Sequence, residues 1–340
     1  MRIRRVERNA ENRMANWVSA GCGAIANELA QAMEKRGQKL YGVVNRTPEK
    51  AVAFAEKYGV QKVFTSFQDV CADPAVDIIY ISTPHNTHIH FLRKALAAGK
   101  HVLCEKPLAP TPKQTAELFE AAKEKGAFLM EAYAYLHSPF VTALKKEIEE
   151  GTIGEIRYIE SQFLTSYYDK SNIRLHKENY GGAVYDLGCY NTSMLLKLLE
   201  DMPSRVKAMA QYDENGVDVY TAALLNYEND VRASITCGMI FEKDKPHRYD
   251  RLYIHGTKGD IKSDTEFNQE GNASYTLIIE GKEQIRNVYC PHNYQLEIEQ
   301  LGRCIIEGET PVVTADFSIK NAKILDAILQ EIGYFESNVM

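Results

Sequence analysis

The hydrophobic and polar positions in the first third of the chain alternate between two periods. Short apolar runs predict buried strands, whereas the stretches between them repeat apolar residues every three or four positions, as amphipathic helices do. The predicted strands cover 17–20, 40–44, 60–64, 76–81 and 101–104, and the predicted helices cover 27–36, 48–58, 66–71 and 87–98. Strands that alternate with helices predict a parallel, doubly wound sheet, so we expect an α/β fold for this part of the chain.

The pattern changes after Glu131. A helix is predicted over 138–150, and beyond it the alternation of apolar and polar residues has a period of two, as in strands. A hairpin is predicted at 217–227 and 231–240, with further strands at 252–255, 275–280 and 284–289 and helices at 294–307 and 318–334. We therefore expect a C-terminal α+β domain with a large open, mainly antiparallel sheet.

Composition excludes several classes of protein. The chain has 340 residues with 40 basic and 46 acidic side chains, a net charge of −6, so neither nucleic acid nor an acidic membrane is expected as a partner. No apolar run approaches the roughly 18 residues of a spanning helix, and we expect no membrane segment. The seven cysteines are scattered without a C-x-x-C pair, which predicts reduced thiols and a cytoplasmic protein.

A glycine-rich turn separates the first predicted strand from the first predicted helix. It reads Gly21-Cys22-Gly23-Ala24-Ile25-Ala26, a G-x-G-x-x-A motif in the strand–turn–helix context of a dinucleotide site. Gly21 permits the tight turn, Gly23 lets the backbone approach a pyrophosphate, and Ala26 allows close helix–strand packing. The same residues also fit an ordinary glycine turn between two core elements. We favour the dinucleotide interpretation, which divides the chain into a tail (1–15), a Rossmann domain (16–131) and a substrate and dimerisation domain (132–340).

The end of the second predicted strand bears on the choice of cofactor. NAD-binding sites place Asp or Glu there for the ribose 2′-hydroxyl, but this chain has Asn45-Arg46-Thr47. The guanidinium of Arg46 can pair with a 2′-phosphate, which a carboxylate would repel. We therefore expect NADP, with NAD as the alternative if Arg46 is only a solvated loop residue.

Ligands of doubly wound sheets bind beyond the carboxyl ends of the strands. Gly21, Arg46, Thr83-Pro84 and Glu105-Lys106 all follow predicted strands, so we expect them to converge on one crevice. Three histidines nearby, at 85, 88 and 90, are not spaced to share one helical face, and we expect no metal site.

The chemistry of hydride transfer requires a group that takes or returns a hydroxyl proton. Asp186 and Tyr190 are four residues apart and would share one face of a helix beginning near Gly182. A tyrosine is a weak base near neutral pH because its pKa is close to 10, but a neighbouring ammonium such as Lys106 would favour the phenolate. Taken singly, Tyr190 also fits a packing role and Lys106 a solvated turn.

These residues together resemble the Gfo/Idh/MocA family of oxidoreductases. The resemblance rests on the glycine turn, Ser82-Thr83-Pro84 followed by His88, Glu131-Ala132-Tyr133, Asp186-Leu187-Gly188-Cys189-Tyr190 and, above all, the stretch from Ala98 to Pro107 that ends in Glu105-Lys106-Pro107. It implies a Rossmann domain followed by an open antiparallel sheet through which subunits pair as a homodimer or a higher oligomer. Tyrosine at 190 resembles the branch of glucose–fructose oxidoreductase and dimeric dihydrodiol dehydrogenase, in which it is the acid/base and NADP is the usual cofactor.

The resemblance and the motifs together define the candidate residues. For catalysis these are Lys106, Tyr190 and Asp186, and for substrate binding Tyr133, Tyr135, Arg174 and His176. For the cofactor they are Gly21, Gly23, Ala24, Ile25, Asn45, Arg46, Thr83, Pro84, His88, Glu105 and Lys106.

The expected function is NADP-dependent oxidation or reduction of a sugar, polyol or related hydroxy or carbonyl compound. Two alternatives stay open. One is a regulatory protein that senses a nicotinamide nucleotide without catalysis, and the other is redox-assisted elimination or hydrolysis of a glycoside. Retention of both Lys106 and Tyr190 favours catalysis over sensing, because a sensor needs only the cofactor site.

Overall fold

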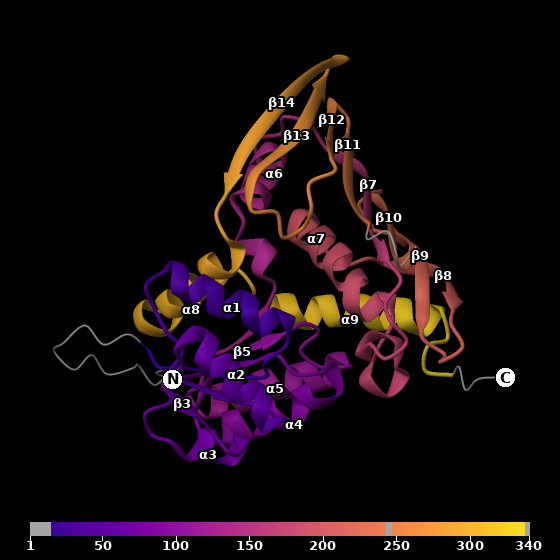
Figure 1. Ribbon diagram of the computed structural model, residues 1–340. Helices are drawn as coiled ribbons and strands as arrows, with labels where there is room; N and C mark the ends of the chain where they lie inside the picture. The colour runs from indigo at the N-terminus through magenta and orange to yellow at the C-terminus, as the bar shows by residue number, and fades with distance from the viewer. Residues whose placement is uncertain (1–14, 243–246, 337–340) are drawn as a thin grey trace. The chain divides into compact units, whose positions relative to one another are not determined.

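The computed structural model describes residues 15–242 and 247–336, which form two compact units (Figure 1). The first unit runs to Ala134 and includes Tyr294–Ser318, and the second contains Tyr135–Asn293 and the chain from Ile319 onward. The arginine-rich tail lies outside the described residues except for residue 15. The expected domain boundary at 131 stays a prediction. The segment Tyr294–Ser318, from near the end of the chain, also belongs to the first compact unit.

The first unit is built on a six-stranded parallel sheet. Its strands are β1 (Trp17–Ala20), β2 (Gly42–Val44), β3 (Lys62–Val63), β4 (Ile78–Ile81), β5 (His101–Glu105) and β6 (Leu129–Ala132), in the order β3-β2-β1-β4-β5-β6. Ala20 pairs with both Val44 and Ile81, so the carboxyl ends of these strands lie at one edge. The predicted Rossmann fold is confirmed. Its last strand was not predicted as a separate element.

Helices connect these strands, because parallel neighbours cannot be joined by a tight hairpin. They are α1 (Ala24–Lys35), α2 (Pro48–Tyr58), α3 (Phe67–Ala72), α4 (His85–Ala97) and α5 (Pro112–Glu124), with α8 (Asn293–Glu307) added from the late segment. Helices α1 and α2 pack together, as do α4 and its neighbours α3 and α5, which is the arrangement of a doubly wound sheet. Arg36, directly after α1, forms an ion pair with Glu299 on α8.

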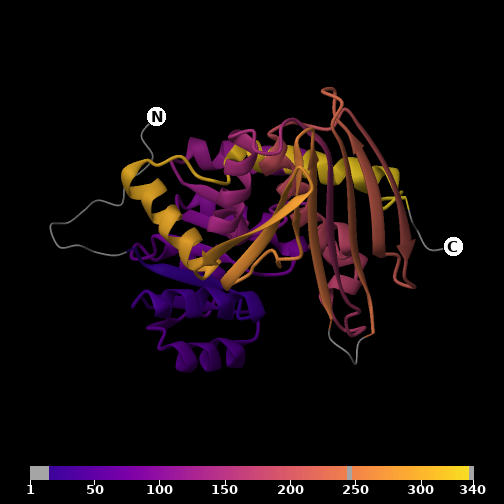
Figure 2. The same cartoon turned by 90° about the horizontal axis from the view of Figure 1, so that it is seen from above.

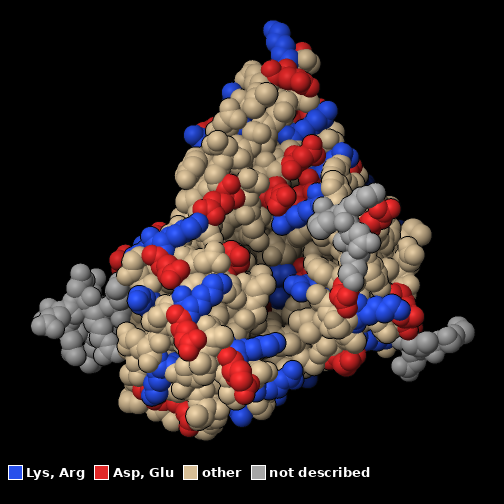
Figure 3. All heavy atoms as spheres, viewed as in Figure 1, with Lys and Arg blue, Asp and Glu red and all other residues tan. Residues whose placement is uncertain are grey.

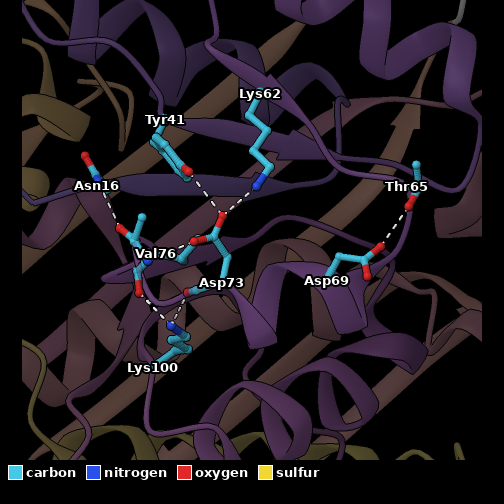
Figure 4. Close-up of polar contacts among 9 residues, drawn as sticks. Asn16, Tyr41, Lys62, Thr65, Asp69, Asp73, Val76 and Lys100 are labelled. Carbon is cyan, nitrogen blue, oxygen red and sulfur yellow. Dashed lines mark hydrogen bonds and ion pairs between the residues drawn. The ribbon is translucent and has the colours of Figure 1, made fainter.

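Side-chain contacts fix the amino-terminal edge of this sheet (Figure 4). The Asp73 carboxylate accepts hydrogen bonds from the Tyr41 hydroxyl at 3.1 Å and from the Lys62 ammonium at 2.7 Å. The largely buried Lys100 ammonium donates to the backbone carbonyls of Asp73 and Val76 at 2.7 and 2.8 Å. Polar side chains therefore tie the loops at this edge together, whereas the opposite edge carries the glycine turn.

The second unit contains an eight-stranded mixed sheet. Its strands are β7 (Ile156–Ser166), β8 (Arg205–Tyr212), β9 (Asp218–Asn226), β10 (Arg232–Phe241), β11 (Arg248–Gly256), β12 (Gly259–Ser263), β13 (Gly271–Ile279) and β14 (Lys282–Cys290), in the order β14-β13-β12-β11-β7-β10-β9-β8. Neighbouring strands pair antiparallel except β7 and β10, which are parallel. The expectation of a mainly antiparallel sheet is confirmed, with this parallel pair at its centre. Figure 2 shows the strands side by side, with the β13–β14 hairpin at one edge.

The two faces of the second sheet differ in burial. Helices α6 (Pro139–Glu149) and α7 (Cys189–Leu199) pack against one face, where β9 and β10 bury residues such as Ala223 and Ile235. On the other face, strand pairing places one row of residues across all eight strands: Lys207, Leu224, Ser234, Glu160, Tyr253, Lys262, Thr276 and Ile285. Every member of this row is exposed or half-buried. We call this surface the outer face.

The surface of the protein carries both signs of charge. On the face drawn in Figure 3, lysine and arginine side chains are interspersed with aspartate and glutamate. Within the described ranges, the helices are too short or too polar to cross a bilayer.

Candidate functional site

The glycine turn adopts a conformation that requires glycine at its first position. Gly21 has φ +118°, and a Cβ there would lie 2.8 Å from Ser82 Oγ and 2.9 Å from the Ser82 carbonyl oxygen. Its amide donates to the Val44 carbonyl at 3.0 Å, which joins the ends of β1 and β2. Gly21 is thus held against the turn that follows β4, and any side chain would break this arrangement.

The second glycine of the turn, Gly23, has open space on the side where a Cβ would lie. Gly23 is the N-cap of α1, has an ordinary φ of −74°, and a Cβ there would meet nothing within 4 Å. No side chain caps α1, and its first turn contains no acidic residue. Ala24 is exposed and Ile25 half-buried. An open helix N-terminus without a competing carboxylate fits the pyrophosphate of a dinucleotide, which the backbone N–H groups would bind.

The segment after β2 presents a cation to solvent. The Asn45 side-chain amide donates to the Thr47 carbonyl at 3.0 Å, which closes the turn, and Arg46 is exposed. Because β2 lies directly beside β1, Arg46 and the glycine turn share one edge of the sheet.

The turns after β4 and β5 are joined by a buried histidine. Thr83 accepts a hydrogen bond from Thr87 at 2.7 Å, and Pro84 is the N-cap of α4. The His88 ring is fully buried, with Nε2 2.8 Å from the Thr83 carbonyl oxygen and Nδ1 3.0 Å from the Pro107 carbonyl oxygen. Within the first unit, the predicted residues of these two turns are therefore brought together.

Lys106 lies in a turn with acidic neighbours. Glu105, at the end of β5, accepts a hydrogen bond from the Tyr80 hydroxyl, and Glu131 on β6 accepts one from the Leu108 amide at 2.8 Å. Burial raises the pKa of Glu131 to about 7, and the positive charge of Lys106 opposes this rise. Lys106 itself is 9% exposed.

In the second unit, Asp186 lies in a π-helical turn, Val184–Gly188, which leads into α7. The sequence predicted an α-helix here, but the Cys189 amide bonds to the Val184 carbonyl, five residues earlier, as in a π-helix. Asp186 is buried and accepts a hydrogen bond from Arg174 Nε at 2.7 Å. The carboxylate of Asp218 accepts a hydrogen bond from the Val184 amide at 2.9 Å and so holds the start of the turn.

Tyr190 is half-buried in a cluster of aromatic rings. Its ring centroid lies 5.4 Å from those of Tyr135, Phe163 and Phe267. Asn268 Nδ2 approaches the Tyr190 hydroxyl at 3.5 Å, the long limit of a hydrogen bond. The rings fix the orientation of the Tyr190 side chain while its hydroxyl keeps a polar neighbour.

The other predicted substrate residues have different surroundings. Tyr135 is fully buried, and its hydroxyl bonds to the Ser193 hydroxyl at 2.7 Å, so within the second unit it supports α7 and the ring of Tyr190. In the first unit, the ring of the buried Tyr133 packs edge-on against Phe317. His176 is half-buried, with Nε2 3.0 Å from the Lys170 carbonyl oxygen. Two of these four bond to predicted catalytic residues: Arg174 to the Asp186 carboxylate, and Tyr135, whose hydroxyl also lies 3.1 Å from the Tyr190 carbonyl oxygen.

Comparisons with known proteins agree with this architecture. Residues 15–133 match the family model "Oxidoreductase family, NAD-binding Rossmann fold", and residues 141–262 match "GFO/IDH/MocA C-terminal domain". The trans-1,2-dihydrobenzene-1,2-diol dehydrogenase of Mus musculus is 30% identical over 337 residues, which cover 93% of this chain and 96% of the relative. The chain belongs to the Gfo/Idh/MocA oxidoreductase family.

Other members of the Gfo/Idh/MocA family are similar over nearly the whole chain. The "D-xylose 1-dehydrogenase (NADP(+)) 2" of Haloferax volcanii is 27% identical over 316 residues, which cover 92% of this chain and 94% of the relative. The structure of KijD10, a 3-ketoreductase from Actinomadura kijaniata in complex with NADP and TDP-benzene, has a TM-score of 0.88 at 25% identity and covers 94% of this chain and 98% of KijD10. As in the family, the first unit of this oxidoreductase is an NAD-binding Rossmann domain.

Apart from Tyr135, the sequence did not reveal the residues that surround Tyr190 in this Gfo/Idh/MocA protein. Phe163 comes from β7, and Phe267 and Asn268 come from the segment between β12 and β13. Arg248 on β11 lies over the Phe163 ring and bonds through Nε and Nη2 to Asp250 at 2.9 and 2.6 Å. The only sequence signal was Arg248-x-Asp250, two residues that share one strand face.

Proposed function

We propose that this protein is an NADP-dependent oxidoreductase that transfers a hydride between the nicotinamide and a sugar, polyol or related hydroxy or carbonyl compound. The observation that carries the proposal is that a Gfo/Idh/MocA chain keeps both Lys106, after β5, and Tyr190, on α7. Its relatives include a dihydrodiol dehydrogenase, an NADP-dependent xylose dehydrogenase and a ketoreductase bound to NADP, all of which act on hydroxyl or carbonyl carbons.

The residues have distinct roles in this proposal. The bound nicotinamide supplies or accepts the hydride. The Lys106 ammonium binds the substrate oxygen and stabilises negative charge on it, and the Tyr190 hydroxyl gives or takes the proton of that oxygen. Asp186 keeps Arg174 in place and orients the substrate, for which Tyr133, Tyr135 and His176 are further candidate contacts.

The second unit surrounds Tyr190 with paired charges as well as rings. The guanidinium groups of Arg174 and Arg248 both interact electrostatically with Tyr190, and each is itself paired with a carboxylate, that of Asp186 or Asp250. The ring cluster adds fixed orientation, so the proton transfer requires little reorganisation of the side chain.

The solved structures of KijD10 provide independent support. They include one variant in which a lysine is replaced by alanine and one in which a tyrosine is replaced by phenylalanine. The two substituted positions of KijD10 are separated by the same number of residues as Lys106 and Tyr190 in this chain. The agreement supports the assignment of these two residues as a functional pair.

The experiment that tests the proposal has two stages. Purified protein is titrated with NADPH and NADH by fluorescence, and a panel of sugars, polyols and carbonyl compounds is then screened for a change in NAD(P)H absorbance. With an active substrate, Lys106→Ala and Tyr190→Phe should bind NADPH as the wild type does and lose turnover. Near-normal turnover of Tyr190→Phe would exclude it as the acid/base. Tight NADPH binding without turnover of any compound would favour the sensor, and cleavage of a glycoside without net oxidation would favour the elimination chemistry.

We also propose that the protein forms a homodimer or higher oligomer through the outer face of the second sheet. Four large hydrophobic side chains of strands β8, β9 and β14 are strongly exposed: Met209 at 72%, Leu224 at 62%, Ile285 at 68% and Tyr289 at 70%. Arg251 stacks against the rings of Tyr249 and Tyr253 in the middle of this face. Exposed apolar side chains spread across a broad sheet are typical of a subunit interface.

A further inference from the structure

His88 has a bonding pattern that a cofactor contact does not explain. Its ring is fully buried, and each nitrogen faces a backbone carbonyl oxygen, that of Thr83 at 2.8 Å and that of Pro107 at 3.0 Å. A carbonyl oxygen accepts hydrogen bonds and cannot donate them, so each contact is favourable when the facing ring nitrogen carries a proton. Both nitrogens of His88 are thus used to join two pieces of backbone.

The two pieces of backbone are the turns that the proposed chemistry uses. Thr83 lies after β4 and next to Ser82, which is in contact with the glycine turn through Gly21. Pro107 follows Lys106 directly. The histidine therefore spans from the part of the edge that holds the cofactor to the residue that contacts the substrate.

The Lys106 turn is fixed on both sides. Before it, Glu105 is bonded by the Tyr80 hydroxyl, and after it, the Leu108 amide donates to Glu131 at 2.8 Å. His88 is a third attachment of the turn, through the Pro107 carbonyl, and its other ring nitrogen faces the Thr83 carbonyl after the neighbouring strand β4. Loss of the ring would leave the turn attached to β4 and β6 through Tyr80 and Glu131 but would remove the contacts that His88 makes with Thr83 and Pro107.

We propose that His88 is a positioning residue, whose ring joins the carbonyl groups of Thr83 and Pro107 and so sets the place of Lys106 relative to the cofactor turn. This inference rests on the proposed function, since His88 acts through Lys106. Burial and the charge of Lys106 lower the pKa of His88, whereas the two carbonyl groups raise it. Burial has the larger effect and the pKa lies below its usual value, so near neutral pH the ring carries one N–H and donates it to one of the two carbonyl oxygens at a time.

Three variants test the inference. His88→Leu removes both ring nitrogens, His88→Gln keeps an amide that can donate to one or both carbonyl groups, and His90→Leu is a matched control on the same helix whose side chain is exposed. Hydrogen–deuterium exchange of the cofactor-free protein measures the backbone directly. We expect faster exchange in His88→Leu at residues 83–88 and 105–111 only, with partial recovery in His88→Gln and none of the effect in His90→Leu.

Kinetics then measure the consequence for Lys106. For His88→Leu we expect kcat to fall by about 10- to 100-fold, as for a displacement near 1 Å, with little change in the NADPH dissociation constant. The deuterium isotope effect from 4-deuterated NADPH should rise, because hydride transfer becomes slower than product release. His88→Gln should recover part of kcat.

Two results would overturn the inference. One is exchange and kcat of His88→Leu equal to those of His90→Leu. The other is a general loss in which exchange rises throughout the first unit and NADPH binding is lost along with kcat, which would make His88 an ordinary core residue. Lys106→Ala separates the two proposals. If this variant keeps full turnover, the proposed function is wrong. If it is inactive while His88→Leu behaves as the wild type does, only the positioning role of His88 is wrong.

Discussion

The guanidinium of Arg174 and the carboxylate of Asp186 form a largely buried ion pair, with Nε and Oδ2 2.7 Å apart. The Arg174 side chain is 29% exposed and that of Asp186 only 5%. The Arg174 carbonyl also accepts a hydrogen bond from the Gly182 amide at 2.8 Å, so the backbone of Arg174 is attached just before the π-helical turn and its side chain within it. Two residues that the sequence assigned to separate roles are thus one structural unit.

Replacing Asp186 by alanine should therefore destabilise the protein even in the absence of ligands. The substitution leaves the Arg174 charge without its partner, and we expect the free energy of unfolding to fall by about 3 kcal/mol in urea denaturation. Arg174→Met combined with Asp186→Leu should recover part of this loss. The exposed pair Lys170–Glu214 is the control, because Glu214→Gln should leave stability nearly unchanged. Equal effects at the two sites would contradict the prediction.

The two glycines of the cofactor turn should respond differently to alanine. Gly21→Ala forces a side chain into a left-handed backbone beside Ser82, so it should lower stability by about 1–3 kcal/mol and weaken NADPH binding. Gly23→Ala meets no protein atom, so it should keep the melting temperature but weaken NADPH binding by about tenfold, since its methyl group would lie where the pyrophosphate approaches. Thermal melts and NADPH titration distinguish them. Unchanged affinity in Gly23→Ala would remove the phosphate site from this turn.

Arg46 should determine the preference for NADP over NAD. A charge-assisted bond to a 2′-phosphate corresponds to about 10- to 100-fold in affinity, so Arg46→Ala should lower the NADP/NAD preference by that factor without weakening NAD. As a control, replacing the exposed Arg93, which lies on α4, by alanine should leave the NADP/NAD preference unchanged. A ratio that stays constant in Arg46→Ala would assign the 2′-phosphate to another residue.

Glu131 should make stability depend on pH near neutrality. Its pKa rises to about 7 in the folded protein from an ordinary value of 4.5, so the folded state holds its proton more tightly than the unfolded state. The associated stability is complete below about pH 4.5 and is lost as the pH rises through 7. Glu131→Gln, which can still accept from the Leu108 amide, should gain about 2 kcal/mol relative to the wild type between pH 5 and pH 8. A pH-independent difference would show that Glu131 stays ionised throughout.

Association through the outer face should be sensitive to charge at Leu224. Leu224→Lys places an ammonium among exposed apolar side chains, and we expect sedimentation velocity to show dissociation into a smaller species. Val52→Lys is the control, because Val52 is 45% exposed on α2 of the first unit. A wild-type sedimentation coefficient for Leu224→Lys would place the interface elsewhere.

The sequence by itself determined the order and type of most elements. Strand β1 and helix α2 have the predicted bounds, because each ends at a local signal, a glycine turn in one case and Pro48 and Gly59 in the other. The alignment of the glycine, Arg46, Thr83 and Lys106 turns at one edge also followed from sequence, since all parallel strands end on the same side. These are properties of local periodicity and chain direction.

Only the tertiary structure decided which side chains meet across the chain. The parallel pairing of β7 with β10, the ring cluster of Tyr190 and the bond between Arg174 and Asp186 join segments whose pairing depends on register, which a single sequence does not encode locally. The same holds for His88. In the sequence it is one of three nearby histidines, and its two carbonyl partners became visible only when α4 was placed between the ends of β4 and β5. Local patterns determined where chemistry could lie, and packing determined which groups hold it in place.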